Sequence, residues 1–137
     1  MLPIVNTYAS FYKRAIDQIS VNSTEHSKVI YAGHYGGLCY HSDGRSHQSL
    51  NDFNLFSALP NFVLLDPVST SHTQLLLDWA VHDNQPLSAY FRLRRTHIPE
   101  LEFINENIIP SDLTLPFVIS EPRLFFLFNL LFLLALH

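Results

Sequence analysis

The chain has 137 residues, of which 15% are charged, and its formal net charge is −4. This length allows one domain with a hydrophobic core but not two ordinary domains. The slightly acidic balance excludes a basic field of the kind that binds nucleic acid. The single cysteine, Cys39, excludes an internal disulfide bond, so we expect a reducing compartment and predict a cytoplasmic location.

The two ends of the chain argue against export and against a membrane protein. The first residues have no basic region ahead of a hydrophobic stretch, so we predict no signal peptide. The apolar run from Leu124 to Leu136 has thirteen residues, whereas a helix that crosses a bilayer needs about 20. We therefore do not expect this run to span a membrane.

Four short apolar segments have the composition of strands: residues 3–8, 28–32, 62–65 and 86–91. The second and third are apolar at successive positions, which is typical of strands buried on both faces of a parallel sheet. A polar break at residues 22–26 and the Pro60-Asn61 pair separate these strands from the helical segments before them.

Helical periodicity fills the intervals between the strands. Ser10 can cap a first helix, residues 50–59 predict a second, and Ser69, Thr70 or Ser71 can cap a third that ends near Asp83. The apolar faces of these helices are Phe11, Ala15, Ile16 and Ile19 in the first, Phe53, Phe56 and Leu59 in the second, and Leu75, Leu76, Trp79 and Ala80 in the third.

Strands that alternate with helical segments predict parallel βαβ units with right-handed crossovers. We therefore predict an α/β fold of three layers, in which flanking helices cover a mostly parallel sheet of about four strands.

The loop of residues 34–48, between the second strand and the second helix, concentrates residues that can do chemistry. It holds three histidines, three glycines, an Asp and an Arg. Loops at this position carry sites in open α/β sheets, and His47 can exchange a proton near neutral pH. The alternative is that His47 is an ordinary surface residue. His34, His41 and His47 are separated by six and five intervening residues, which matches no compact zinc motif, so we predict no metal site.

The same loop carries a family resemblance. The run Asp43-Gly44-Arg45-Ser46-His47-Gln48, followed by Asp52, Leu59-Pro60-Asn61 and Asp66-Pro67, resembles the pyrimidine-binding domain of transketolase-type thiamine diphosphate enzymes, which have Asp-Gly-Pro-Thr-His there. Residues 8–19 resemble the segment aromatic-x-x-Phe-x-x-Arg-Ala-x-Asp-Gln that transketolase shares with 1-deoxyxylulose-5-phosphate synthase. The match spans Pro3 to Arg95, and the order and spacing of its parts make it specific.

The resemblance implies a partial thiamine diphosphate-binding fold and a role for seven residues. The implied roles are cofactor binding around the aminopyrimidine ring for Tyr8, Phe11 and Arg14, proton transfer in catalysis for His47, and binding of a sugar-phosphate substrate for His34, Arg92 and Arg95. The alternative is that these residues have ordinary structural roles. Phe11 would then be a core residue, and the arginines would be solvated residues on a helix and at the end of a strand.

Some positions depart from the family's pattern. Arg45 and Ser46 stand where the family has Pro-Thr, and the loop between His34 and Asp43 is longer by one residue. The synthases carry Asp-Arg where this chain has His34-Tyr35, which slightly favours transketolase.

Parts of the family's cofactor site have no match in the chain. The activating glutamate of the family lies on a helix ahead of the strand at residues 3–8, and no Glu here matches it. The Gly-Asp-Gly and Asn that hold magnesium and diphosphate are also unmatched. We therefore expect a partner chain or second subunit to carry the diphosphate-binding domain with magnesium, in a homo- or hetero-oligomer, and expect the chain alone to be inactive.

The intact family transfers two-carbon ketol units between sugar phosphates. The alternatives to a transketolase-like subunit are a fragment of a 1-deoxyxylulose-5-phosphate synthase and a non-catalytic remnant or binding module. Along the chain we assign residues 1–95 to a partial pyrimidine-binding domain, 96–123 to a linker or the start of another domain, and 124–137 to an atypical apolar tail.

Deleting residues 124–137 should raise the soluble, monomeric fraction without lowering the melting temperature. The four predicted strands end before this tail, and its Leu and Phe residues leave no polar face, so an exposed tail would drive association. Size-exclusion chromatography and thermal melts check this. A truncated chain that melts many degrees earlier would show that the tail belongs to the core.

Overall fold

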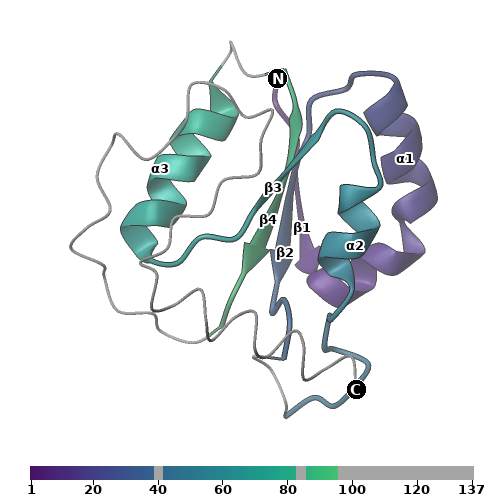
Figure 1. The fold of residues 1–137 in the computed structure, drawn as a ribbon, viewed down its shortest axis with the longest axis vertical. Coiled ribbons are helices and arrows are strands. Elements are labelled where there is room, and N and C mark those ends of the chain that lie inside the picture. The colour runs from purple at the N-terminus through teal and green to yellow at the C-terminus, as the bar shows by residue number, and fades with distance from the viewer. Residues whose placement is uncertain (39–41, 83–85, 96–137) are drawn as a thin grey trace. The chain divides into compact units, whose positions relative to one another are not determined.

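The computed structural model describes residues 1–38, 42–82 and 86–95, which form a sheet with helices on both faces (Figure 1). Contacts divide the chain into two compact units, Met1–Ile104 and Asn105–His137. The described elements all belong to the first unit. The predicted linker at 96–123 and tail at 124–137 lie outside the described residues, as do Cys39 and His41.

The elements alternate as predicted from the periodicity. In chain order they are β1 (Ile4–Tyr8), the 3-10 helix η1 (Ala9–Arg14), α1 (Ile16–Thr24), β2 (Ile30–His34), α2 (Asp52–Ser57), β3 (Phe62–Leu65), α3 (Thr70–Val81) and β4 (Ser88–Leu93). No helix of the described residues has both the length and the apolar character needed to cross a bilayer.

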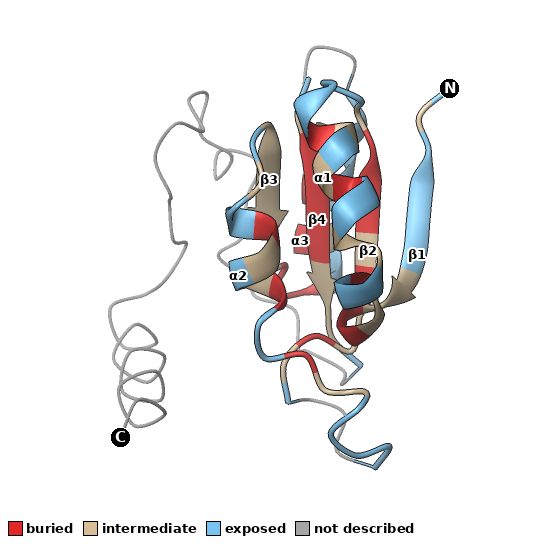
Figure 2. Cartoon of the chain, turned by 90° about the vertical axis from the view of Figure 1, so that its right-hand side faces the viewer, coloured by how far each residue is buried: buried red, intermediate tan, exposed pale blue. Residues whose placement is uncertain are grey.

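The four strands form one parallel sheet in the order β1-β2-β4-β3. The central strands β2 and β4 are the most buried, and β1 is largely exposed along one edge (Figure 2). The helices η1, α1 and α2 cover one face of the sheet and α3 lies on the other (Figures 1 and 2). The predicted three-layer α/β fold with a parallel four-stranded sheet is therefore confirmed.

The first helix differs from its prediction. Ser10 caps nothing, and the segment begins as a 3-10 turn before an α-helix starts at Ile16. Three residues per turn place Ala9 and Tyr12 on one side, and both are buried. The Tyr12 hydroxyl lies 2.8 Å from the Val5 carbonyl oxygen, to which it donates, and 3.2 Å from that of Ala32. The 3-10 turn thus brings Tyr12 into the core, a position outside the predicted apolar stripe.

Two strands begin two residues later than predicted, and both shifts have one cause. Ser88, rather than Pro86, opens β4, because its hydroxyl accepts from the Val29 amide at 3.1 Å and donates to the Ser27 carbonyl at 2.8 Å. The parallel register then pairs Ile30 with Ala89. As a result His34 and Arg92 lie inside strands rather than in the loops that follow them.

The remaining segments follow their predictions more closely. β3 has the predicted bounds, but it is an edge strand and mostly half-buried rather than buried. α2 is shorter than residues 50–59. α3 starts at Thr70 with the predicted Ser69 cap, whose hydroxyl accepts from the His72 amide at 3.1 Å.

The core on the η1, α1 and α2 side is built from aromatic rings. Phe56 stacks on Tyr90 with ring centres 4.0 Å apart, and Tyr12 meets both rings edge-on. Tyr31 extends the cluster toward β3. Large rings at four positions join both central strands to the helices above them.

Replacing Gly33 with Ala should lower the free energy of unfolding by about 1–3 kcal/mol, the usual cost of overpacking a core. A methyl group there would lie 2.5 Å from the Tyr90 hydroxyl oxygen, and Tyr90 is fully buried. Urea denaturation measures the effect. The exposed-site control Val21→Ala should stay within about 0.5 kcal/mol of wild type. Equal stabilities for Gly33→Ala and wild type would contradict this packing.

Candidate functional site

The predicted site residues lie at one edge of the sheet, where its parallel strands end. Tyr8 is the last residue of β1 and pairs with His34, the last residue of β2, which in turn pairs with Leu93 at the end of β4. Open α/β sheets bind ligands outside the carboxyl ends of their strands. The sheet itself therefore brings together residues that are far apart in the sequence.

Four half-buried rings form a cluster at this edge. Tyr8 lies edge-on to Phe11 with ring centres 5.2 Å apart, and His47 lies 5.4 Å from Tyr8 and 5.3 Å from Phe11. Tyr35 packs against the other side of Tyr8 at 4.7 Å. The cluster thus joins β1, η1, the end of β2 and the loop before α2. It contains three of the predicted residues, two assigned to cofactor binding and one to proton transfer.

Cationic residues border the ring cluster on both sides. The Arg14 guanidinium lies 5.5 Å from the centre of the Phe11 ring, and that of Arg95 lies 5.6 Å from the centre of the Tyr35 ring. The His34 ring lies 6.3 Å from Tyr35. Six of the seven predicted residues therefore join one continuous set of ring and cation contacts, in which Tyr35 is the link that sequence reasoning missed.

Tyr35 has an uncommon backbone conformation. Its φ is +57°, in the left-handed region that residues other than Gly, Asn and Asp rarely adopt. The turn allows the Gly36 amide to bond the Leu93 carbonyl at 3.2 Å and tilts the Tyr35 ring onto Tyr8. Its place directly after His34, between a strand and two glycines, was the available sequence signal.

The seventh predicted residue, Arg92, has other partners. It extends from β4 toward Asp52 at the start of α2, with Nη2 donating to Oδ1 at 3.0 Å and Nε 3.0 Å from Oδ2. The Arg92 side chain is 18% exposed and that of Asp52 is 0% exposed. The Phe53 ring lies 4.8 Å from the same guanidinium. The predicted phosphate-binding role of Arg92 stays a prediction, and this guanidinium is already engaged.

Tyr90 completes the environment of the buried carboxylate. Its hydroxyl donates to Asp52 Oδ2 at 2.8 Å. Burial, and then the adjacent negative charge of Asp52, raises the pKa of Tyr90 far above its usual value. Tyr90 therefore stays protonated and remains a donor across the working range of pH. The sequence offered one signal for this network: Asp52 occupies the position four residues before Phe56, on the buried face of α2.

The network also holds the base of the loop that carries His47. Arg92 Nη2 donates to the Ser49 carbonyl at 3.3 Å, and Ser49 exchanges two backbone hydrogen bonds with Gly37, at 2.7 and 3.1 Å. A side chain at Gly36 would lie 2.4 Å from the Arg92 stem, so this position requires glycine. Gly37 and Ser49 thus close the loop, and Arg92 ties the closure to the sheet.

His47 itself is held by its loop neighbours. Its backbone amide donates to the Gly44 carbonyl at 3.2 Å, and its Nδ1 lies 2.9 Å from the Ser46 hydroxyl, which can donate to it or accept from it. If the serine donates, the ring proton lies on Nε2. Among the described residues no three His, Cys, Asp or Glu side chains come together as a metal site.

Comparison with known proteins identifies the family. Residues 1–100 match the family described as transketolase, pyrimidine binding domain. A curated relative, the 1-deoxy-D-xylulose-5-phosphate synthase of Treponema pallidum, is 34% identical over 87 residues, which are 63% of this chain and 14% of the relative. The chain thus spans about one-seventh of that relative's length.

Solved structures agree on the fold. The transketolase of Campylobacter jejuni superposes with a TM-score of 0.62 at 21% identity, over 70% of this chain and 15% of that one. A split-gene transketolase, solved as an inactive beta4 tetramer, superposes with a TM-score of 0.57 at 26% identity, over 77% of this chain and 32% of that one. With a family match over nearly three quarters of its length, the chain belongs to the transketolase pyrimidine-binding domain family.

Proposed function

We propose that the chain supplies the pyrimidine side of a thiamine diphosphate site in an enzyme that transfers two-carbon ketol units between sugar phosphates. The observation that carries the proposal is the cluster of Tyr8, Phe11 and His47 at the carboxyl edge of the sheet. Its rings are half-buried, so they offer aromatic surface to a planar ligand together with a group that can move a proton.

The residues at this edge fit an aminopyrimidine ring. Tyr8 and Phe11 can stack on the aminopyrimidine ring or border it. Arg14 lies beside Phe11 and offers hydrogen-bond donors to the nitrogens of the aminopyrimidine. When bound, the cofactor supplies a nucleophilic thiazolium carbon for cleaving and forming carbon–carbon bonds. The role of the protein's rings is then to orient the cofactor and to keep water from its reacting end.

His47 is the residue that we assign to proton transfer. Its ring lies against Tyr8 and Phe11, the two aromatics assigned to cofactor binding, and an imidazole can both accept and donate a proton. Because Ser46 engages Nδ1, we assign to Nε2 the contact with a substrate hydroxyl. His47 would take up and return protons of the sugar's hydroxyl groups.

For the sugar phosphate we favour Arg95 and His34 over Arg92. Arg95 lies at the far side of the ring cluster, past Tyr35, and is exposed at the end of the strand region. Arg92 is turned inward onto Asp52. In this arrangement Arg95 and His34 contact the phosphate, while Arg92 holds the loop of His47 in place.

We infer that a partner chain or second subunit supplies the diphosphate-binding domain with its magnesium, and the activating glutamate. One finding supports this: a structural neighbour is a transketolase encoded as a split gene. The predicted cytoplasmic location rests on the single cysteine alone.

Two other functions are alternatives to this proposal. A part of a 1-deoxyxylulose-5-phosphate synthase is favoured by the 34% identity to that enzyme. A non-catalytic remnant is favoured by the departures at Arg45 and Ser46, next to the proposed proton-transfer residue.

The isolated chain should bind the aminopyrimidine part of thiamine weakly, and thiamine diphosphate with magnesium hardly more tightly. The aromatic cluster can hold the ring, whereas the expected diphosphate and magnesium ligands are not in the chain. Amide chemical shifts and calorimetry measure both affinities. Phe11→Leu should abolish the shifts, and the matched Phe62→Leu variant on β3 should keep them. Micromolar binding of thiamine diphosphate by the chain alone would contradict the divided site, and no response to the pyrimidine would favour the remnant.

In a complex reconstituted with a diphosphate-binding partner, His47→Ala should lower turnover by about 10²–10⁴-fold, the usual contribution of a proton-transfer group. Arg95→Ala should instead mainly raise the Michaelis constant for phosphorylated substrates, since a remote phosphate contact contributes uniform binding. Steady-state kinetics separate the two effects. Near-normal turnover of the His47 variant would return this histidine to an ordinary loop position.

A further inference from the structure

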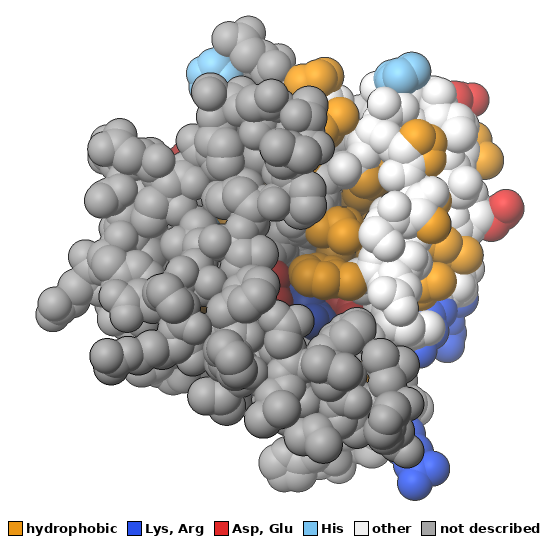
Figure 3. Space-filling view, viewed as in Figure 1, with side chains coloured by type: hydrophobic (Ala, Val, Ile, Leu, Met, Phe, Trp, Pro, Cys, Tyr) orange, Lys and Arg blue, Asp and Glu red, His pale blue; other side chains and the backbone are white. Residues whose placement is uncertain are grey.

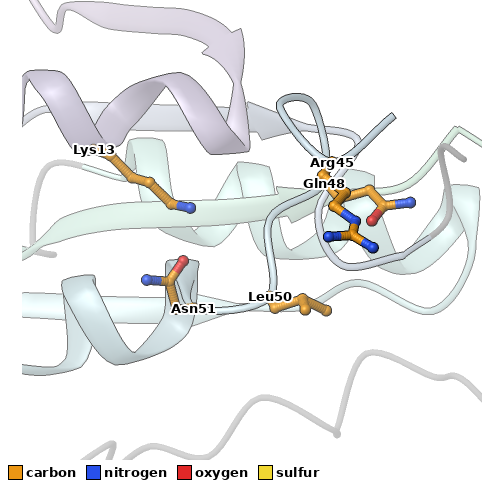
Figure 4. A pocket seen from close by; sticks show the side chains of 5 residues that line it. All are labelled: Lys13, Arg45, Gln48, Leu50 and Asn51. Carbon is orange, nitrogen blue, oxygen red and sulfur yellow. The ribbon is translucent and has the colours of Figure 1, made fainter. Parts of the chain in front are cut away.

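A cavity lies beside the His47 loop, outside the aromatic cluster. Its volume is about 440 Å³, and Figure 4 shows the side chains that line it: Lys13, Arg45, Gln48, Leu50 and Asn51. Lys13 reaches in from η1, whereas Arg45 and Gln48 come from the loop on the opposite side and Asn51 from just before α2 (Figure 4). The proposed cofactor and substrate residues are not among them.

The cavity is cationic and its polar groups are uncommitted. Two of its five side chains are positively charged, two are amides, and neither Asp nor Glu lines it. Among the described residues, no hydrogen bond or ion pair engages the side chains of Lys13, Arg45 or Gln48, and Asn51 makes no capping bond to α2. The space-filling view shows Lys and Arg side chains at the lower right of the molecule (Figure 3).

The neighbouring acidic residues do not neutralise this charge. Asp52 follows Asn51 directly, but it is turned into the core and held by Arg92 and Tyr90. Asp17 and Asp43, the acidic residues closest in sequence to Lys13 and Arg45, form no ion pair with them in the described structure. A local excess of two positive charges therefore remains, on a chain whose net charge is −4.

We propose that this cavity binds the phosphoryl group of a small phosphate ester. Arginine forms paired hydrogen bonds to phosphate oxygens, lysine adds a point charge, and the two amides can donate further bonds. The volume falls within the range of small-molecule sites, so there is room for the organic part of an ester as well. Arg45 stands where the resemblance expects proline, so this site is a property of this chain's loop. It is separate from the phosphate contact proposed for Arg95.

Calorimetric titration of the full chain with fructose 6-phosphate, inorganic phosphate and fructose tests the site. The ester should bind most tightly, inorganic phosphate more weakly, and neutral fructose not measurably. Lys13→Gln and Arg45→Gln should each weaken ester binding by about three- to five-fold, as expected for one exposed charge contact, and the double variant should weaken it further. Raising the salt concentration should weaken it as well.

The matched control is Lys28→Gln, which removes the same charge from a lysine that donates to the His82 carbonyl. It should leave ester binding unchanged. Arg45→Lys should retain most of it. Circular dichroism melts verify that each variant is folded. Binding of the aminopyrimidine should be unaffected by the Lys13 and Arg45 variants. The proposal for the cavity and the proposal for the aromatic cluster are therefore tested independently. A double variant that binds the ester like wild type, or inorganic phosphate that binds as tightly as the ester, would overturn the proposal.

Discussion

The buried carboxylate of Asp52 is the constraint on which the rest of the site depends. A charge removed from water is costly unless it is paired and hydrogen-bonded, and a partner lost from such a pair costs about 3–5 kcal/mol. Tyr90 and Arg92, both on β4, supply those partners at 2.8 and 3.0 Å. One acidic side chain thereby fixes the position of α2 against the central strand of the sheet.

The pair of Asp52 and Arg92 also helps to fix the geometry at the carboxyl edge of the sheet. Arg92 also holds the Ser49 carbonyl, Ser49 closes the loop through Gly37, and the loop presents His47 to Tyr8 and Phe11. Tyr90 in turn stacks on Phe56 in the aromatic core. Core packing and the geometry of the carboxyl edge therefore share residues, so a change at the buried pair should affect both the stability of the fold and the position of His47. Arg92 is for this reason better placed as a positioning residue than as a phosphate contact.

The loop after β2 faces two environments. His47 packs on the half-buried rings, while Arg45 and Gln48, within two residues of it, line the cationic cavity together with Lys13. The two sides of the loop suit different ligands. The rings offer planar aromatic surface, and the cavity offers hydrogen-bond donors and positive charge. If both sides bind ligands, occupancy of the cavity would bias the conformation of the loop that carries His47.

Periodicity determined the fold class and the order of the elements, and the family resemblance pointed to six of the seven residues that meet at the sheet edge. These features are local: a capped helix such as the one after Ser69, or a run such as residues 62–65, is encoded in neighbouring residues. Only the tertiary structure decided what depends on distant partners. Contacts between segments far apart in the chain account for four features. These are the shifted starts of β2 and β4, the 3-10 turn that buries Tyr12, the inward orientation of Arg92 toward Asp52, and the role of Tyr35 as a link. No local pattern records such contacts, because the energy that selects them arises only when the sheet has formed.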